Sequence, residues 1–162
     1  MNISEHSRVW IYQSDRILEP AEVNQIQDNL DSFTSQWLAH GKELLAAAEI
    51  RYNQFIILSV DEQQTGSTGC SIDKSVYLMK ELEQQFNIRL FDRFSLAYRD
   101  GESIKTVNRD DFEKLLQART INSETVVFNN LVLTRKELET NWEVPLKDSW
   151  HARVFSLQVQ SP

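Results

Sequence analysis

The most regular pattern of apolar and polar positions lies between Glu19 and Gly41. Apolar residues recur there at steps of three and four, which is the spacing of one face of an α-helix. They are Val23, Ile26, Leu30, Phe33 and Trp37. Pro20 suits the first helical position, and His40-Gly41 supplies a cation-capable ring and a glycine for the C-terminal end. We therefore predict a helix from Glu19-Pro20 to His40-Gly41.

Two β-rich stretches flank this helix. Residues 8–13 combine aromatic and β-branched residues and predict a first strand, with Trp10 and Tyr12 on one face. Residues 55–61 form a nearly unbroken apolar run, which is typical of a central strand covered on both faces. Residues 42–52 fit a helix by propensity and a strand by alternation. We favour the strand, folded antiparallel onto residues 55–61 through a turn at Asn53-Gln54.

A second amphipathic helix follows the glycine-containing stretch 65–71. Its apolar stripe recurs at helical spacing, and Ser71 is the expected N-cap. The stripe consists of Ile72, Val76, Met79, Leu82 and Phe86. Residues 89–91 and 94–98 are predicted strand material, and the turn 99–102 leads into another strand at 103–107.

The rest of the chain alternates short elements. Asn108 is predicted to cap a short helix that carries Phe112, Leu115 and Leu116. A strand at 125–128 is interrupted at Asn129-Asn130, which we interpret as a bulge, with apolar residues 131–133 beyond it. A capping box at residues 134–137 opens a last helix, which Pro145 prevents from continuing.

This order of elements predicts an α+β fold: a mixed or antiparallel sheet with about four helices packed on it. The chain has 162 residues and no interior linker, so residues 1–162 are expected to form a single domain. From their periodicity, apolar residues of four predicted elements are expected to be buried together in one core. They are Trp10, Trp37, Phe55, Ile57, Val76, Met79 and Leu82.

Composition narrows the functional classes. The chain carries 17 Lys and Arg against 24 Asp and Glu, a formal net charge of −7, and its basic residues do not cluster. Nucleic-acid binding would therefore lack its electrostatic driving force. The sequence has a single cysteine, no apolar run near the length of a membrane helix and no signal-like start. We expect a soluble, acidic cytoplasmic protein without membrane insertion.

Several short motifs together resemble a known family. They are Trp37-Leu38-Ala39-His40-Gly41, Val60-Asp61-Glu62, Gly69-Cys70-Ser71-Ile72-Asp73, Phe91-Asp92-Arg93, Val127-Phe128-Asn129-Asn130-Leu131 and Ser149-Trp150-His151. Over about residues 8–155 the chain resembles a family of short uncharacterised bacterial proteins that often carry the label "ABC transporter ATPase". The family has no established activity that the resemblance could imply for this chain.

The residues themselves do not predict nucleotide hydrolysis. A P-loop requires Gly-x-x-x-x-Gly-Lys-Ser/Thr to wrap backbone amides and a lysine around phosphates. The only Gly-Lys pair, Gly41-Lys42, is followed by Glu43 and has Gln36 where the first glycine should stand. A transporter signature of the Leu-Ser-Gly-Gly-Gln type is also missing from the sequence.

The stretch from Thr65 to Asp73 is the candidate site. It brings two of the four glycines and the only cysteine into one predicted strand-to-helix turn. Backbone amides at a helix N-terminus bind anions, so the predicted ligand-binding residues come from this turn. They are Gly66, Ser67, Thr68, Gly69, Ser71 and Asp73.

Cys70 is the candidate nucleophile of this site. His40 or His151 would act as its base, with Asp73, Asp92 or Asn130 as the group that orients the base. In the alternative interpretation, the two glycines only shape a tight turn and Cys70 is a buried filler. We favour the filler and expect its thiol to be occluded. The histidines and the cysteine show no metal-site spacing, so neither a metal nor a cofactor is predicted.

Two function classes therefore remain. The first is a non-catalytic domain that acts through a protein partner or as a homo-oligomer. The second is a small-molecule binder or enzyme built on residues 65–73 with Cys70. A concave pocket on which this loop, Asp92 and a histidine converge would favour the second.

Overall fold

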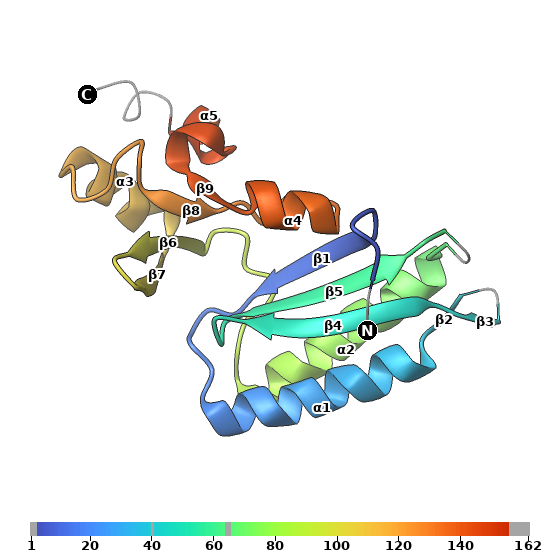
Figure 1. Cartoon of the computed structure of the whole chain (residues 1–162). Helices are drawn as coiled ribbons and strands as arrows, with labels where there is room; N and C mark the ends of the chain where they lie inside the picture. Colours follow the sequence, from blue (N-terminus) through green and yellow to red (C-terminus); the bar gives the residue numbers. More distant parts are fainter. Residues whose placement is uncertain (1–2, 40, 64–65, 156–162) are drawn as a thin grey trace. The chain divides into compact units, whose positions relative to one another are not determined.

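The secondary structure is that of an α+β protein with antiparallel sheets (Figure 1). The computed structural model describes residues 3–39, 41–63 and 66–155, and five α-helices lie within them, four of at least seven residues. The predicted fold class is therefore confirmed. The residues pack as two compact units, Met1–Phe91 with Leu133–Lys136, and Asp92–Val132 with Glu137–Pro162. The prediction of one domain over residues 1–162 stays a prediction.

A three-stranded antiparallel sheet organises the first unit, with strand order β1-β5-β4. Its strands are β1 (Arg8–Gln13), β4 (Leu45–Arg51) and β5 (Phe55–Asp61). The strand predicted at residues 42–52 is confirmed over Leu45–Arg51, whereas Lys42–Glu43 belong to a separate two-stranded sheet. The central place of β5 is confirmed. Tyr52 and Asn53 have positive φ angles, 55° and 53°, which gives β4 and β5 a tight connection.

Helices α1 (Pro20–Gln36) and α2 (Gly69–Phe86) cover one face of this sheet (Figure 1). Alternate strand residues point toward them, as the two-residue period of a strand requires. The core on this face includes Ile56, Leu58 and Val60 of β5, and the helices contribute Ile26, Leu30, Met79 and Leu82. Phe55 and Ile57 are also fully buried, but they point to the opposite face.

The predicted common core was therefore wrong in part. Trp37, Met79 and Leu82 are buried in the core between sheet and helices, but Trp10 and Val76 are only half-buried. The buried face of α2, which was predicted to be apolar, also includes Ser71 and Ser75. The Ser75 hydroxyl donates to the Ile72 carbonyl at 2.6 Å, so a polar side chain is tolerated there.

The end of α1 also differs from the prediction. The helix stops at Gln36, and Trp37 is already extended, with φ −75° and ψ 122°. Strands β2 (Leu38–Ala39) and β3 (Lys42–Glu43) then pair as a small hairpin. Gly41 has a φ of 73°, so its left-handed conformation serves this turn and not a helix cap.

The second unit holds a four-stranded antiparallel sheet, with strand order β7-β6-β8-β9. Its strands are β6 (Leu96–Asp100), β7 (Ser103–Val107), β8 (Val126–Phe128) and β9 (Glu143–Pro145). Its helical segments are α3 (Arg109–Gln117), α4 (Arg135–Asn141), whose first two residues belong to the first unit, η1 (Leu146–Asp148) and α5 (His151–Val154). A separate core forms around the fully buried Phe112 and Leu146.

Two local predictions in this half were wrong. Residues 89–91 are irregular and not strand, because the chain leaves α2 through a left-handed Asn87, with φ 53° and ψ 54°. Asn129-Asn130 do not form a bulge, because β8 ends at Phe128 and a turn follows. The cap at Asn108 is confirmed, since its side chain accepts the Asp111 N–H at 2.8 Å.

Candidate functional site

The loop before α2 closes on itself through its own polar groups. Thr68, not Ser71, is the N-cap of α2, and its hydroxyl accepts the Ser71 N–H at 3.1 Å. The Ser71 hydroxyl in turn accepts the Thr68 N–H at 2.7 Å. This reciprocal arrangement satisfies two donors that the predicted anion site would have used.

A carboxylate also occupies the inner side of this loop. Glu62 Oε2 accepts from the backbone N–H of Ser67 at 3.0 Å and from its hydroxyl at 3.2 Å. An anionic ligand here would meet the like charge of Glu62. Neither Gly66 nor Gly69 has a left-handed φ, and a Cβ at Gly69 would meet nothing within 4 Å. The glycines are therefore not required by the backbone of this turn.

Cys70 is exposed, so the prediction of an occluded thiol was wrong. The cause is the earlier start of α2, at Gly69 instead of after Ser71. With this start, Ser71 takes the first inward position of the helix and Cys70 faces away from the sheet. Asp73 is also exposed and lines a shallow groove of about 430 Å³ beside Phe33 and Tyr77.

The predicted partners of Cys70 have other surroundings. His40 and Thr65 lie outside the described residues. Asp92 belongs to the second unit, where its carboxylate accepts the Phe94 N–H at 2.9 Å in a turn. Asn130 accepts the indole N–H of Trp142 at 2.9 Å. These contacts give Asp92 and Asn130 structural roles, and their part in a site with Cys70 stays a prediction.

His151 is a core residue of the second unit. The residue is 1% exposed. Its ring stacks on Trp150, with the ring centroids 3.9 Å apart, and the centroid of the Phe112 ring lies 5.9 Å away. Its Nδ1 shares a 2.7 Å hydrogen bond with the Ser149 hydroxyl. Burial lowers the pKa of His151 from 6.5 to about 4, because a charged imidazolium would lose its hydration. The ring is therefore neutral at neutral pH.

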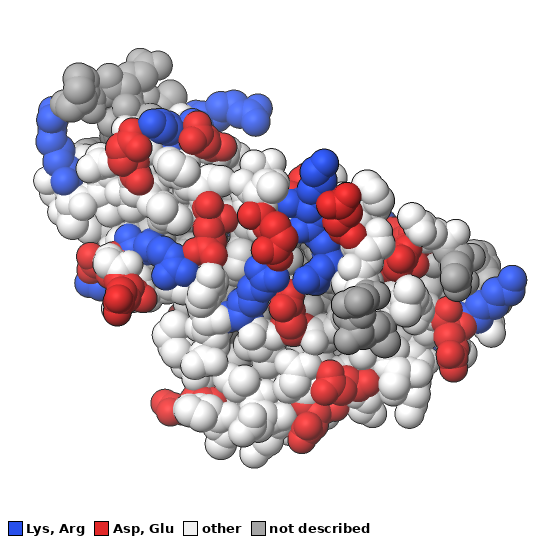
Figure 2. All heavy atoms as spheres, in the orientation of Figure 1, with Lys and Arg blue, Asp and Glu red and all other residues white. Residues whose placement is uncertain are grey.

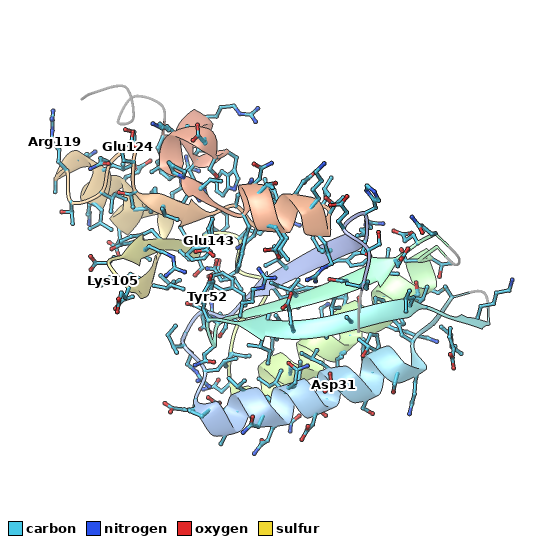
Figure 3. The ribbon with its side chains drawn as sticks, viewed as in Figure 1. Asp31, Tyr52, Lys105, Arg119, Glu124 and Glu143 are labelled. Atoms are coloured by element: carbon cyan, nitrogen blue, oxygen red, sulfur yellow. The ribbon has the colours of Figure 1, made fainter. Side chains whose placement is uncertain are left out.

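A different place in the first unit has the geometry of a binding site: a cleft of about 350 Å³ along strand β4. The strand contributes four consecutive residues, Ala46, Ala47, Ala48 and Glu49. Asp31 and Thr34 of α1 line one side, and Figure 3 labels Asp31 on the helix that runs along β4. Ile57, Ser59, Arg135 and Ile3 complete the lining. The cleft thus follows an edge of the sheet.

The residues of β4 whose backbone N–H and C=O groups point away from β5 determine which hydrogen bonds this edge can form. The Arg51 carbonyl accepts the Gln54 N–H at 3.1 Å, so Arg51 faces β5. Successive residues of a strand point their backbone groups to opposite sides, so Ala46, Ala48 and Ile50 face outward. The Gln27 amide confirms this direction, because it donates to the Ala48 carbonyl at 3.1 Å.

The open part of the edge begins after Leu44. The Leu44 N–H still donates to the Trp37 carbonyl at 2.9 Å. Beyond it, within the described part of the chain, no acceptor pairs with the outward N–H groups of Ala46, Ala48 and Ile50. Ala46 and Ala48 carry only methyl side chains on this edge, whereas edges are usually protected by lysine, proline or bulges.

A cationic cluster lies on the face of β4 away from the helices. Arg135 Nη1 approaches Glu49 Oε1 at 3.3 Å and the Ser59 hydroxyl at 3.0 Å. Arg51 Nη2 approaches the same Glu49 oxygen at 3.2 Å. Two guanidinium groups therefore approach one carboxylate. Among the described residues, Arg135 uses only Nη1, so Nε and Nη2 can donate to a further acceptor.

Sequence reasoning missed this cleft. The Ala-Ala-Ala run of its strand has helix propensity and carries no chemically distinctive side chain. Arg135 lies 86 positions from Glu49, so no local motif connects them. The one available signal was the alternation of residues 44–52, which marks a strand, together with the absence of a gatekeeper residue in its first half.

Comparisons with known proteins add no further information on the site. The chain matches no family model, no curated protein and no solved structure. Within the described ranges, no group of three or more His, Cys, Asp or Glu side chains is placed to hold a metal ion. No described helix is long and apolar enough to cross a membrane. On the face shown in Figure 2, acidic and basic side chains alternate without a continuous basic area.

Proposed function

We propose that this chain is a non-catalytic binding domain that takes up an extended protein segment along the open edge of β4. One observation carries the proposal: Ala46 and Ala48, whose backbone groups face outward from β4, line a cleft of about 350 Å³. A segment added as a fourth strand would pair with Ala46, Ala48 and Ile50. In this mode, backbone hydrogen bonds supply affinity and alternate side-chain contacts supply specificity.

The walls of the cleft support such an occupant. The side chains of an added strand would alternate between the two faces of the sheet. On one face they would meet the guanidinium of Arg135, and on the other they would meet the carboxylate of Asp31. An acidic residue followed by a basic residue would complement both walls.

The other edges of the two sheets are less suited to this role. At β1 the Val9 N–H already donates to the Leu133 carbonyl at 2.9 Å, so that edge is occupied within the first unit. In the second unit, β7 carries Lys105 and β9 ends with Pro145. A lysine and a proline are the residues that typically block strand addition.

Selected peptides test the proposal. Random 12-residue peptides are selected on the folded protein, and the best binder is then synthesised with one backbone nitrogen methylated at a time. Strand addition predicts a loss of affinity of about tenfold or more at every second position, because only alternate amides donate to the edge. Methylation at the positions between them is expected to have little effect.

A substitution in the protein provides the matched control. Ala48→Pro removes one outward N–H and is expected to weaken peptide binding about tenfold, while Ala48→Ser keeps the N–H and the affinity. Circular dichroism checks that both variants are folded. Selected peptides that bind both variants equally, or that show no period of two under methylation, would contradict the proposal.

A second candidate function is a binder or enzyme built on residues 65–73, and the exposure of Cys70 is the observation in its favour. The loop amides that Glu62 and Thr68 already engage argue against an anionic ligand. Screening an electrophile library at equal concentrations against folded protein and a Cys-containing peptide tests this candidate. A compound that modifies Cys70 at least tenfold faster than the peptide would support it.

A further inference from the structure

We infer that the segment that occupies the edge of β4 is β4 of a second copy of this chain. The inference rests on the proposed function and names the partner. Two copies would pair their β4 strands antiparallel across a twofold axis, and the two three-stranded sheets would become one sheet of six strands. Such an interface is self-complementary, because the same edge serves both copies.

The outward backbone groups fix the register. Residues whose N–H and C=O groups both point across an antiparallel interface must face one another as hydrogen-bonded pairs. Only Ala46, Ala48 and Ile50 offer such groups on the open edge. The register with the greatest overlap places Ala48 opposite Ala48 of the second copy, and Ala46 opposite its Ile50. The Ala48 carbonyl can accept a second hydrogen bond beside the one from Gln27, because it has two lone pairs.

Side-chain size agrees with this register. The two copies of Ala48 face each other on the axis, so no large side chain opposes another at the centre of the interface. The larger Ile50 would lie beside the small Ala46 of the other copy. Large residues that face small ones fill the space between packed elements without overlap.

Charge complementarity supports the same arrangement. In this register, Glu49 of the second copy would lie opposite Ala47, on the face that carries Arg135. Arg135 contacts Ser59, which is the β5 partner of Ala47, and its Nε and Nη2 have no partner among the described residues. A second carboxylate would therefore arrive beside the Nε and Nη2 donors of Arg135. The twofold axis repeats this contact, so two arginines and two glutamates would alternate across the interface.

The pairing would stop at two copies. The first unit's sheet has only two edges, and the β1 edge is covered by residues 133–136 through the Val9–Leu133 hydrogen bond and the bridge between Arg8 and Thr134. Once the β4 edges pair with each other, this sheet offers no further edge. A closed dimer, not a filament, is the expected assembly.

Sedimentation velocity from about 1 to 200 μM tests the assembly. The wild-type chain is expected to form a dimer, and Ala48→Pro is expected to weaken dimerisation at least tenfold while Ala48→Ser does not. A wild-type chain that stays monomeric over this range would overturn the inference. If backbone methylation of a bound peptide still weakens its affinity at every second position, the proposed function remains supported even when the chain is monomeric.

Disulfide cross-linking tests the register directly. In a Cys70→Ser background, a cysteine introduced by Ala48→Cys would face its own copy across the axis, with Cα atoms about 5.5 Å apart. That separation lies within the range of about 4.4–6.8 Å that a disulfide spans. Mild oxidation is expected to cross-link Ala48→Cys several times faster than the neighbouring Ala47→Cys. Equal rates, or faster cross-linking of Ala47→Cys, would overturn the register.

Discussion

Acid is expected to destabilise the second unit through His151. The ring is 1% exposed, and its neighbours are the aromatic rings of Trp150 and Phe112 and the hydroxyl of Ser149. None of these groups carries a charge that would stabilise an imidazolium. Burial therefore lowers the pKa of His151 to about 4 in the folded protein, whereas an unfolded chain has a histidine pKa of about 6.5.

The sign and size of the effect follow from these two values. Between pH 6.5 and 4 the unfolded chain binds a proton at His151 and the folded chain does not, so the free energy of unfolding falls as the pH falls. The stabilisation is fully present above pH 6.5 and is lost by about pH 4. A difference of about 2.5 pKa units corresponds to about 3 kcal/mol.

Urea unfolding at pH 7, 6, 5 and 4, followed by tryptophan fluorescence, measures this loss. The matched variant is His151→Gln, which keeps a hydrogen-bonding side chain but does not titrate. Carboxylates contribute equally to both proteins, so the difference between their pH profiles isolates His151. We expect the wild-type protein to lose about 2–3 kcal/mol more than the variant from pH 7 to pH 4. Parallel profiles would refute the assignment of a buried neutral ring.

Three further predictions concern Phe55, Cys70 and Trp37 of the first unit, and Phe94 of the second unit serves as a control. Phe55→Ala should lower the free energy of unfolding in urea titrations by about 3–5 kcal/mol, because Phe55 is fully buried on the central strand. Phe94→Ala, at a residue 67% exposed, should lower it by less than about 0.5 kcal/mol. A loss below about 1 kcal/mol for Phe55→Ala would contradict its burial. Iodoacetamide should alkylate Cys70 in the folded protein at a rate within a few-fold of that in urea, and strong protection would contradict its exposure. Trp37→Phe should lower the free energy of unfolding by about 1–3 kcal/mol, because the 2.8 Å hydrogen bond from the indole N–H to the buried Ser71 carbonyl is lost. An unchanged midpoint of thermal unfolding would contradict that contact.

Periodicity was sufficient to predict most elements of this fold. Residues 23–37 have apolar residues at steps of three and four, and residues 44–52 have them at alternate positions. Both patterns indicate an element with one buried face, and the structure has a helix and a strand there. The boundaries were less predictable. Gly41 fits a helix cap and a hairpin turn equally well, because both require a positive φ, and only the pairing of β2 with β3 decides between them.

The candidate site was harder to predict than the fold. Cys70 and the glycines carry distinctive chemistry and therefore predicted a site, yet Glu62 and Thr68 engage the amides of that loop. The cleft along β4 depends on backbone groups, which every residue has, and on Arg135, which only the tertiary structure brings to Glu49. Neither feature leaves a local motif in the sequence.

The exchange of single backbone amides in β4 tests the central claim most directly. Nuclear magnetic resonance can follow hydrogen exchange at Ala46, Ala48 and Ile50, with Ala47 and Glu49 as internal controls that face β5. In dilute protein, we expect the three outward amides to exchange much faster than the two controls. A bound peptide, or a concentration at which the dimer forms, should slow the outward amides at least tenfold and leave the controls unchanged. Outward amides that are already protected in dilute protein, or that do not respond to any occupant, would contradict the claim that this edge is the binding site.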